Sequence, residues 1–415
     1  MKIAIIGSGI SGLTSAYLLN RRHQISVFEA NDWVGGHTHT ISVEHAGERH
    51  AIDTGFIVFN DWTYPNFIRL LEQLGVPYKP TQMSFSVSDP VSGTEYNGNT
   101  LNSLFAQRSN LVSVKFWAMI RDILRFNREA IDDLDKLRIH PATTLGEYLK
   151  TGGYSSRFTE HYIVPMGAAI WSMSPQDMLG FPLQFFIRFF KNHGLLSVSN
   201  RPQWCVIEGG SSRYVEPLIE SFKQQIRLSC PVQRVVRDEQ GVDIHSASGV
   251  ERFDKVIFAC HSGQALKLLA EPSLQEQQIL GALRYADNEV VLHTDTRLLP
   301  QRPLAWASWN YRLGGPAEQP AAVTYNMNIL QGIQSTSTFC VSLNQSAQID
   351  PDKVLARYTY AHPQYSLDGV AAQIRSEELQ GANHSYFCGA YWANGFHEDG
   401  VVSALRVAQH FSETL

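Results

Sequence analysis

Lys2-Ile3-Ala4-Ile5-Ile6-Gly7-Ser8-Gly9-Ile10-Ser11-Gly12 opens the chain, and this stretch decides the fold. The short apolar run before Gly7 predicts a buried parallel strand. In the G-x-G-x-x-G turn, Gly7 permits the bend, Gly9 lets the backbone approach a pyrophosphate, and Gly12 lets a helix pack closely on the strand. The helix expected at 11–20 would aim its N–H groups at that phosphate. The pattern therefore predicts a dinucleotide-binding α/β unit.

A second strand, an acidic residue and a glycine pair extend this unit. Residues 25–29 are the expected strand, and Glu29 lies where a carboxylate can hydrogen-bond an adenosine ribose. Gly35 and Gly36 follow shortly afterwards. An NAD site does not need such a pair. The pair resembles the extension found in glutathione-reductase-type flavoproteins, and this resemblance implies FAD. The chain has no second G-x-G-x-x-G unit, and hence no separate NAD(P)H domain is expected.

Composition narrows the class of protein. The chain has 415 residues, 44% of them hydrophobic, and a formal charge of −5, without the basic patch that nucleic-acid binding requires. Its five cysteines show no C-x-x-C or zinc spacing, so we expect neither a disulfide framework nor a metal. Because the turn begins at Gly7, no signal peptide is expected before it. We expect a cytoplasmic protein, with contact to the inner face of the membrane left open.

The C-terminal and central segments predict further parts of the same site. Residues 385–390 are expected to form a buried strand ending at a small-residue turn, followed by a helix at 401–411. A Gly-Gly stretch at 209–210 precedes a helix expected near 214–225, and residues 255–260 are expected to form another buried strand. The resemblance of these segments to the corresponding segments of flavin amine oxidases implies a discontinuous FAD-binding domain at 1–75, 200–262 and 381–415. The substrate domain would take 76–199 and 263–380.

The expected elements of the substrate domain are strands at 83–88, 288–295, 321–327 and 339–343, with helices at 114–134 and 144–150. The predicted fold class is α/β, or α+β overall. It consists of a glutathione-reductase-type FAD-binding Rossmann domain with an interleaved substrate domain of mixed sheet plus helices.

These motifs resemble those of the flavin amine oxidase and phytoene desaturase superfamily. The chain departs from that pattern at His37, where an arginine usually meets the pyrophosphate, and at Ala390, where an acidic residue often binds the ribityl chain. The resemblance also implies that the last helix points its N-terminus at the flavin. It implies cofactor contacts from Gly7, Gly9, Ile10, Ser11, Gly12, Glu29, Ala30, Gly35, Gly36, His37, Thr38, Thr54, Gly55, Phe56, Val232, Cys260, Gly389, Ala390, Phe396, His397, Glu398, Gly400 and Val401.

Further stretches are similar to a bacterial subgroup that includes the flavin desaturase of furan fatty acid biosynthesis. They lie at 52–60, 63–67, 171–172, 192–196, 305–311 and 395–400. The subgroup is associated with cyclopropane-fatty-acid-synthase-like methyltransferases. The resemblance therefore implies a membrane phospholipid acyl chain as substrate and a lipid-methyltransferase pathway as partner.

The sequence also bears on the kind of substrate. Amine oxidases of this superfamily usually carry a lysine near the flavin, yet the chain has no lysine between Lys267 and Lys353. We expect His397, and after it Glu398, to act as the proton-accepting catalytic residue. The expected substrate contacts are Phe396, Trp171 and Trp306. Alternatives are an amine oxidase, a carotenoid-type desaturase or isomerase, and a non-catalytic flavin protein that assists a lipid-modifying partner.

Two aromatic segments, at 115–126 and 181–191, leave a choice between a lipid interface and ordinary core. Both contain basic residues among their apolar ones, as interfacial helices do. An apolar stripe at helical spacing is, however, more often buried in a globular core.

Overall fold

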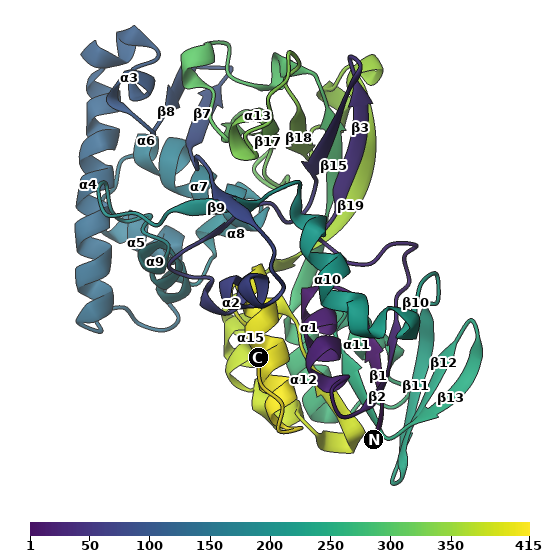
Figure 1. Ribbon diagram of the computed structural model, residues 1–415. Coiled ribbons are helices and arrows are strands. Elements are labelled where there is room, and N and C mark those ends of the chain that lie inside the picture. The colour runs from purple at the N-terminus through teal and green to yellow at the C-terminus, as the bar shows by residue number, and fades with distance from the viewer.

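The computed structural model describes residues 1–415, which form two parts (Figure 1). The part that carries both termini is built on a five-stranded sheet in the order β10-β2-β1-β14-β20, with every neighbouring pair parallel. Three distant segments of the chain thus lie side by side in one sheet. Its strands are β1 (Lys2–Ile6), β2 (Gln24–Phe28), β10 (Ile226–Arg227), β14 (Lys255–Phe258) and β20 (Ser385–Phe387).

The alternation of side chains along β1 explains how this sheet is covered. Ile3 and Ile5 join a core with α1 (Ile10–Leu19) and α15 (His397–Gln409). Ala4 and Ile6 point to the opposite face and join a second core with β11 and β12. Both faces of the strand are therefore buried, as its continuous apolar run predicts. The elements that cover this opposite face of the sheet are β11 (Val232–Asp238), β12 (Gly241–Ser246), β13 (Gly249–Phe253), α11 (Ser262–Leu268) and α12 (Leu274–Ala282).

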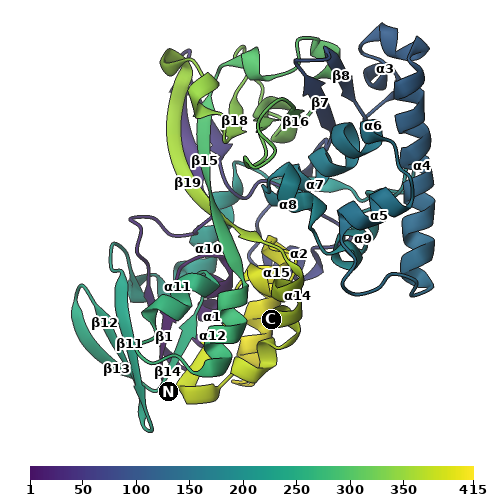
Figure 2. The same cartoon turned by 180° about the vertical axis from the view of Figure 1, so that it is seen from behind.

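The other part contains a seven-stranded sheet in the order β19-β15-β18-β17-β16-β7-β8. Its two longest strands, β15 and β19, run down into the first part, as Figure 2 shows from behind. The strands are β7 (Phe85–Asp89), β8 (Thr94–Asn97), β15 (Arg284–His293), β16 (Trp309–Arg312), β17 (Val323–Asn326), β18 (Cys340–Leu343) and β19 (Val354–Gln364).

Helices cover one face of this large sheet through a core of 29 buried residues. Its outermost helix is α4, which runs along the edge of the molecule (Figure 1). The remaining helices are α2 (Pro65–Gln73), α3 (Leu101–Leu104), α4 (Val114–Asp135), α5 (Leu145–Thr151), α6 (Ser156–Phe158), α7 (Val164–Trp171), α8 (Pro175–Leu179), α9 (Leu183–Asn192), α10 (Val215–Ile219), α13 (Met327–Leu330) and α14 (Leu367–Ile374). None of them is long and apolar enough to cross a bilayer.

A two-stranded hairpin and a small three-stranded sheet connect the parts. The hairpin of β3 (Thr40–His45) and β4 (Glu48–Asp53) packs on the large sheet, because Val43 and Ile52 share a core with Val290 and Leu292. Strand β9 (Trp204–Ile207) lies between β5 (Phe59–Asn60) and β6 (Tyr78–Pro80).

Some elements differ from those expected. Helix α15 begins at His397, four residues before the expected start, because the Asp399 carboxylate accepts the N–H of Phe396 and caps the first turn. The helix expected near 214–225 is broken into short turns around Phe222, whose φ of −138° is not helical. The aromatic segment at 181–191 lies in α9 and is core rather than surface, since Phe186 and Phe190 are buried.

Candidate functional site

A cavity of about 820 Å³ lies where the two parts meet. Its lining includes the residues at or just after the carboxyl ends of β1, β2, β14 and β20. This edge of a parallel sheet is where open α/β folds bind their ligands. Residues from α7, β15, β16 and β19 close the opposite side. The cavity therefore draws its walls from both parts of the molecule.

Three glycines shape the first turn of the site. Gly7 has a φ of +107°, and a Cβ there would lie 2.8 Å from the carbonyl oxygen of Ala259. A Cβ on Gly12 would lie 2.0 Å from the carbonyl oxygen of Gly7, so only glycine lets α1 pack this closely. Gly9, in contrast, faces open space and lines the cavity. These contacts give each glycine the role that a pyrophosphate-binding turn requires.

The buried carboxylate of Glu29 braces this turn. It accepts hydrogen bonds from the Ser8 backbone N–H at 2.9 Å, from the Ser8 hydroxyl at 2.6 Å and from the Asn31 N–H at 2.8 Å. Glu29 also lines the cavity, so its remaining acceptor capacity faces the place of a ribose.

The start of α15 forms another wall. Phe396 and His397 both line the cavity. The Nε2 atom of His397 lies 2.9 Å from the Thr38 hydroxyl and 3.3 Å from that of Tyr214, while its ring stacks on Phe56 at 3.5 Å. Burial lowers the pKa of His397 well below the usual value for histidine. Its imidazole is therefore neutral near neutral pH.

Most of the predicted site residues meet in this cavity. Those that line it are Gly7, Gly9, Ile10, Ser11, Glu29, Ala30, Gly35, Gly36, His37, Gly55, Phe56, Trp171, Val232, Cys260, Gly389, Ala390, Phe396 and His397.

The others support the site from behind. Gly12 and Gly400 sit at helix contacts, Thr38 holds the His397 ring, and Val401 is fully buried in the core with α1. The Thr54 hydroxyl lies 2.9 Å from that of Tyr360, which does line the cavity.

Two predicted residues lie elsewhere and need correction. The Glu398 carboxylate points to the start of α2, where it accepts the backbone N–H groups of Asn66 and Phe67 at 3.2 and 2.9 Å. It caps that helix and is not part of the cavity wall. Trp306 donates its indole N–H to the carbonyl of Pro300 at 2.7 Å and also lies outside the cavity.

The structure adds residues that the sequence interpretation missed. Trp309, three positions after Trp306, lines the cavity, and its buried indole N–H has no hydrogen-bond partner. Tyr360 and His362 alternate on β19 and face the cavity together. His261 follows the carboxyl end of β14. Its position directly after the expected strand is the sequence signal that could have found it.

The residues present fit a flavin dinucleotide. The open face of Gly9, the braced Glu29 and the unpartnered Nε2 of His37 supply groups for a pyrophosphate and a ribose. Trp171, Phe396 and Trp309 supply apolar parts of the lining. Fold and site together define the class as a flavoprotein with a Rossmann-type dinucleotide-binding domain.

Comparison with known proteins gives the family. The profile described as "Flavin containing amine oxidoreductase" matches residues 10–320, most of the chain. The chain therefore belongs to the flavin-containing amine oxidoreductases, an enzyme family that uses FAD.

Individual relatives are more distant. A putative flavin-containing monoamine oxidase of Mycobacterium tuberculosis is 25% identical over 66% of this chain and 59% of its own length. A 1-hydroxycarotenoid 3,4-desaturase of a Flavobacterium species is 46% identical over 18% of this chain and 14% of its own. A solved fatty acid isomerase of P. acnes that produces CLA shares the fold, with a TM-score of 0.68 at 14% identity over 99% of this chain and 98% of its own.

Proposed function

We propose that the protein removes hydrogen from an apolar acyl chain, a methylated chain of a membrane phospholipid, in an FAD-dependent oxidation. The observation that carries this proposal is the scarcity of charge in the cavity. The side chains of Glu29, Lys267 and Asp287 are the only carboxylates, lysines or arginines in its lining. Glu29 is committed to the glycine turn, and the other two are solvent-exposed residues. The deep wall is aromatic and aliphatic, which suits a hydrocarbon.

The same lining argues against a charged amine as the substrate. An ammonium group taken into a cavity needs a buried carboxylate or similar partner, because an unpaired charge is costly to desolvate. Asp287 is exposed and cannot provide such burial. No lysine lies within the deep wall, where amine oxidases of the superfamily usually have one.

His397 is the residue that we propose as the proton acceptor. When bound, FAD would supply the hydride acceptor. The hydroxyls of Thr38 and Tyr214 hold the Nε2 atom of His397 and fix the ring, which leaves Nδ1 without a hydrogen bond inside the protein. A neutral imidazole held in this way can receive a proton at Nδ1 from a substrate in the cavity.

Two of the compared proteins support an apolar substrate by their names, one a fatty acid isomerase and the other a hydroxycarotenoid desaturase. The chemistry also requires a source of methylated chains. A lipid methyltransferase would make this substrate and is the pathway partner we propose.

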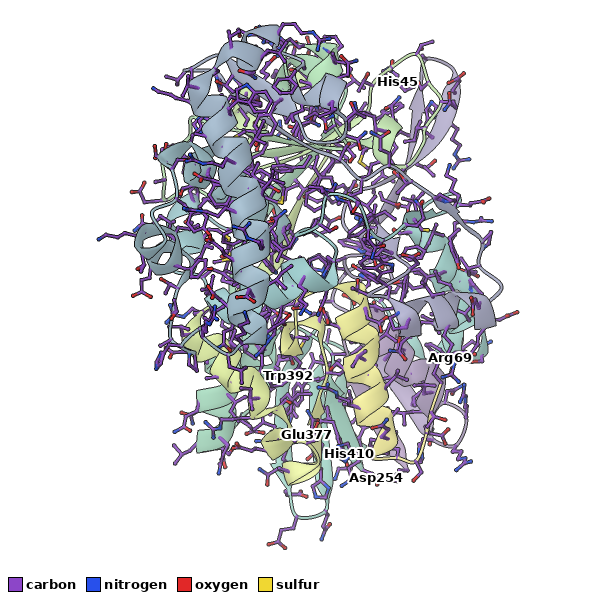
Figure 3. All side chains as sticks on the ribbon, turned by 90° about the vertical axis from the view of Figure 1, so that its left-hand side faces the viewer. His45, Arg69, Asp254, Glu377, Trp392 and His410 are labelled. Atoms are coloured by element: carbon purple, nitrogen blue, oxygen red, sulfur yellow. The ribbon has the colours of Figure 1, made fainter.

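Helix α4 supports contact with a membrane. Over its first four turns the outward face combines apolar with basic side chains: Val114, Trp117, Arg121, Leu124 and Arg128 are all exposed, before the face ends at the exposed Asp135. The opposite face, with Phe116 and Phe126, is buried in the core. Packing in the core requires apolar residues only on the inner side of a helix. The exposed apolar and basic side chains of α4 are not explained by core packing, and they fit contact with an anionic lipid surface. We propose that this face rests on the membrane (Figure 3, in which α4 faces the viewer).

The reaction can be tested with purified protein under anaerobic conditions. Vesicles that contain methylated acyl chains are added, and flavin absorbance and acyl mass are followed together. We expect bleaching of the flavin and the loss of two hydrogens from the chain. Bleaching by polyamines but not by these vesicles would instead identify an amine oxidase. Flavin that no candidate substrate bleaches would identify a non-catalytic flavin protein.

A further inference from the structure

Three histidines from distant parts of the chain converge in the cavity wall. The ring of His37 lies 5.9 Å from that of His261 and 5.7 Å from that of His362, measured between centroids. The His261 ring stacks on Tyr285 at 4.3 Å, and Nδ1 of His362 lies 2.9 Å from the Ser172 hydroxyl. All three histidines line the cavity. We name His37, His261 and His362 the histidine cluster.

The cluster lies beside the glycine turn. Gly36, directly before His37, packs against Gly9, since a Cβ on Gly36 would lie 3.1 Å from the Gly9 Cα. Ala259, two residues before His261, packs against Gly7, since a Cβ on Gly7 would lie 2.8 Å from the Ala259 carbonyl oxygen. Two of the three histidines, His37 and His261, therefore belong to segments that pack directly on the phosphate-binding turn. The third, His362, comes from β19 of the other part.

The cluster has an unpaired ring nitrogen but no counter-charge of its own. The Nε2 atom of His37 is buried without a hydrogen-bond partner. Burial lowers the pKa of His261 and of His362 to about 3, and the neighbouring imidazoles lower both values further. The pKa of His37 is also lowered by burial. No carboxylate contributes to any of these three shifts. A buried polar group without a partner is costly, so Nε2 of His37 favours a polar ligand. Once the cluster holds a proton, the absence of a neighbouring carboxylate leaves an anion to supply the counter-charge.

The two tyrosines that contact the histidine cluster do not supply the negative charge that an anionic ligand would bring. Tyr285 and Tyr360 contact the cluster through their rings and stay neutral, because burial raises the pKa of Tyr360 to about 12 and that of Tyr285 further. The remaining titratable groups in the lining are Glu29, Lys267, Asp287, Cys260, Tyr325, Tyr391 and His397.

We propose that His37, His261 and His362 form the phosphate-binding end of the cavity in place of a single arginine, and that the dinucleotide pyrophosphate binds there together with a proton. The proposal rests on FAD being the cofactor and goes beyond it by assigning the anion site and its proton. A guanidinium is charged at every relevant pH, whereas an imidazole is charged only when it holds a proton. The cluster therefore makes flavin affinity depend on pH.

Proton linkage determines the direction in which FAD affinity changes with pH. Without an anion the imidazoles are neutral, and a bound pyrophosphate raises their pKa values by direct attraction. Binding then takes up protons in the window between the free and the bound pKa. Affinity is greatest below that window, falls across it by up to about tenfold per pH unit for one linked proton, and levels off above the bound pKa.

The test begins with the purified holoprotein. It is diluted in buffers from about pH 6 to about pH 9, and released FAD is measured by its fluorescence. We expect the dissociation constant to rise with pH for the wild type. The His37→Arg variant should show little pH dependence and hold FAD more tightly at high pH. The His37→Gln variant should bind more weakly at low pH, with a shallower slope. Unfolding of each variant is followed by circular dichroism to confirm that it is folded.

Controls separate the histidine cluster from other causes. His245→Gln, on β12 outside the cavity, should retain the wild-type slope. Riboflavin, which lacks phosphate, should bind without pH dependence, whereas ADP-ribose should compete with FAD best at low pH. Dodecyl phosphate tests the other source of a phosphate. If it binds the FAD-loaded protein with the same pH dependence, the cluster serves a substrate phosphate and the assignment to the dinucleotide is overturned.

Failure of the inference differs from failure of the proposed function. Protein that holds FAD with an affinity independent of pH, and in which His37→Arg behaves as the wild type, contradicts the histidine cluster alone. Protein that takes up no flavin at any pH contradicts the proposed function itself.

Discussion

Glu398 and His397 are neighbours at the start of α15, yet their side chains have different surroundings. The His397 ring lines the cavity, while the Glu398 carboxylate accepts two N–H groups of α2 and the side-chain amide of Asn66 at 2.7 Å. Consecutive residues in the first turn of a helix point about 100° apart, so one of them can face a ligand and the next a neighbouring helix. Sequence motifs located both residues and could not distinguish their directions.

The direction of the Glu398 side chain predicts that its mutation lowers stability and leaves FAD binding unchanged. Glu398→Gln should lower the free energy of unfolding by about 1–3 kcal/mol, because the new amide NH₂ faces backbone N–H donors that then lack an acceptor. FAD content should stay normal. Denaturant unfolding measures this, with Glu216→Gln as the control at an exposed ion pair, where the change should stay within about 0.5 kcal/mol. Normal stability together with lost turnover would place Glu398 in the chemistry after all.

Position 37 shows another limit of reading single residues. The motif predicts a phosphate contact there, and the departure from arginine is visible in the sequence. The link between His37 and the two other histidines of the cluster is not visible there, because His261 and His362 lie 224 and 325 positions away from His37 in the chain. No local periodicity links them, and only the folded sheet brings them together.

The helices at either end of the chain depend on each other. A Cβ on Gly400 of α15 would lie 2.7 Å from Cγ2 of Ile10 and 2.9 Å from Oγ of Ser11, both in the first turn of α1. Gly400→Ala should therefore push that turn, which lines the cavity, and weaken FAD binding by about tenfold, with a loss of stability of about 1–3 kcal/mol. The dissociation constant of FAD and the unfolding midpoint measure the two effects.

Gly263→Ala provides the matched control for this element. It lies in α11, where a Cβ would meet nothing within 4 Å. The replacement should be neutral or slightly stabilising, since alanine loses less entropy than glycine on folding. If Gly400→Ala binds FAD as tightly as Gly263→Ala, the proposed coupling between α1 and α15 is wrong.

Among the strands that sequence analysis could predict, those in the middle of the parallel sheet have continuous apolar runs. β1 and β14 are such strands, because a parallel sheet buried on both faces needs apolar side chains at every position. Strand β19 was missed although it is the longest. Tyrosine, threonine and histidine interrupt its apolar residues, and most of its side chains are half-buried, so the strand contains no continuous apolar run. The missed strand carries Tyr360 and His362 into the site.

At the scale of the whole molecule, the site belongs to neither part alone. The glycine turn and α15 come from one part, and β19 with α7 comes from the other (Figures 1 and 2). Each half can be assigned from its own motifs. The shape of the cavity between them depends on how the sheets are oriented, which follows from packing of the long strands β15 and β19 and leaves no local signal in the sequence.

The outward face of α4 gives the whole molecule an orientation. Val112, two residues before α4, and Val114 at its start are each 84% exposed, and Arg121 and Arg128 lie on the same side of the helix as Val114. The protein carries a net charge of −5, so a local basic and apolar surface is needed to approach an anionic bilayer against general repulsion. The wild type should therefore bind vesicles that contain anionic lipid, and binding should weaken as salt is added.

The double variant Val112→Asp/Val114→Asp should partition onto such vesicles about tenfold more weakly, because it removes two apolar contacts and adds two negative charges. Cosedimentation measures the partition, and FAD content shows that the fold is intact. Ile374→Asp, on α14 with a comparable exposure of 82%, is the matched control and should bind as the wild type does. Equal losses in both variants would mean that charge alone governs binding. No binding by the wild type would mean that α4 faces water and that the substrate reaches the cavity without a membrane.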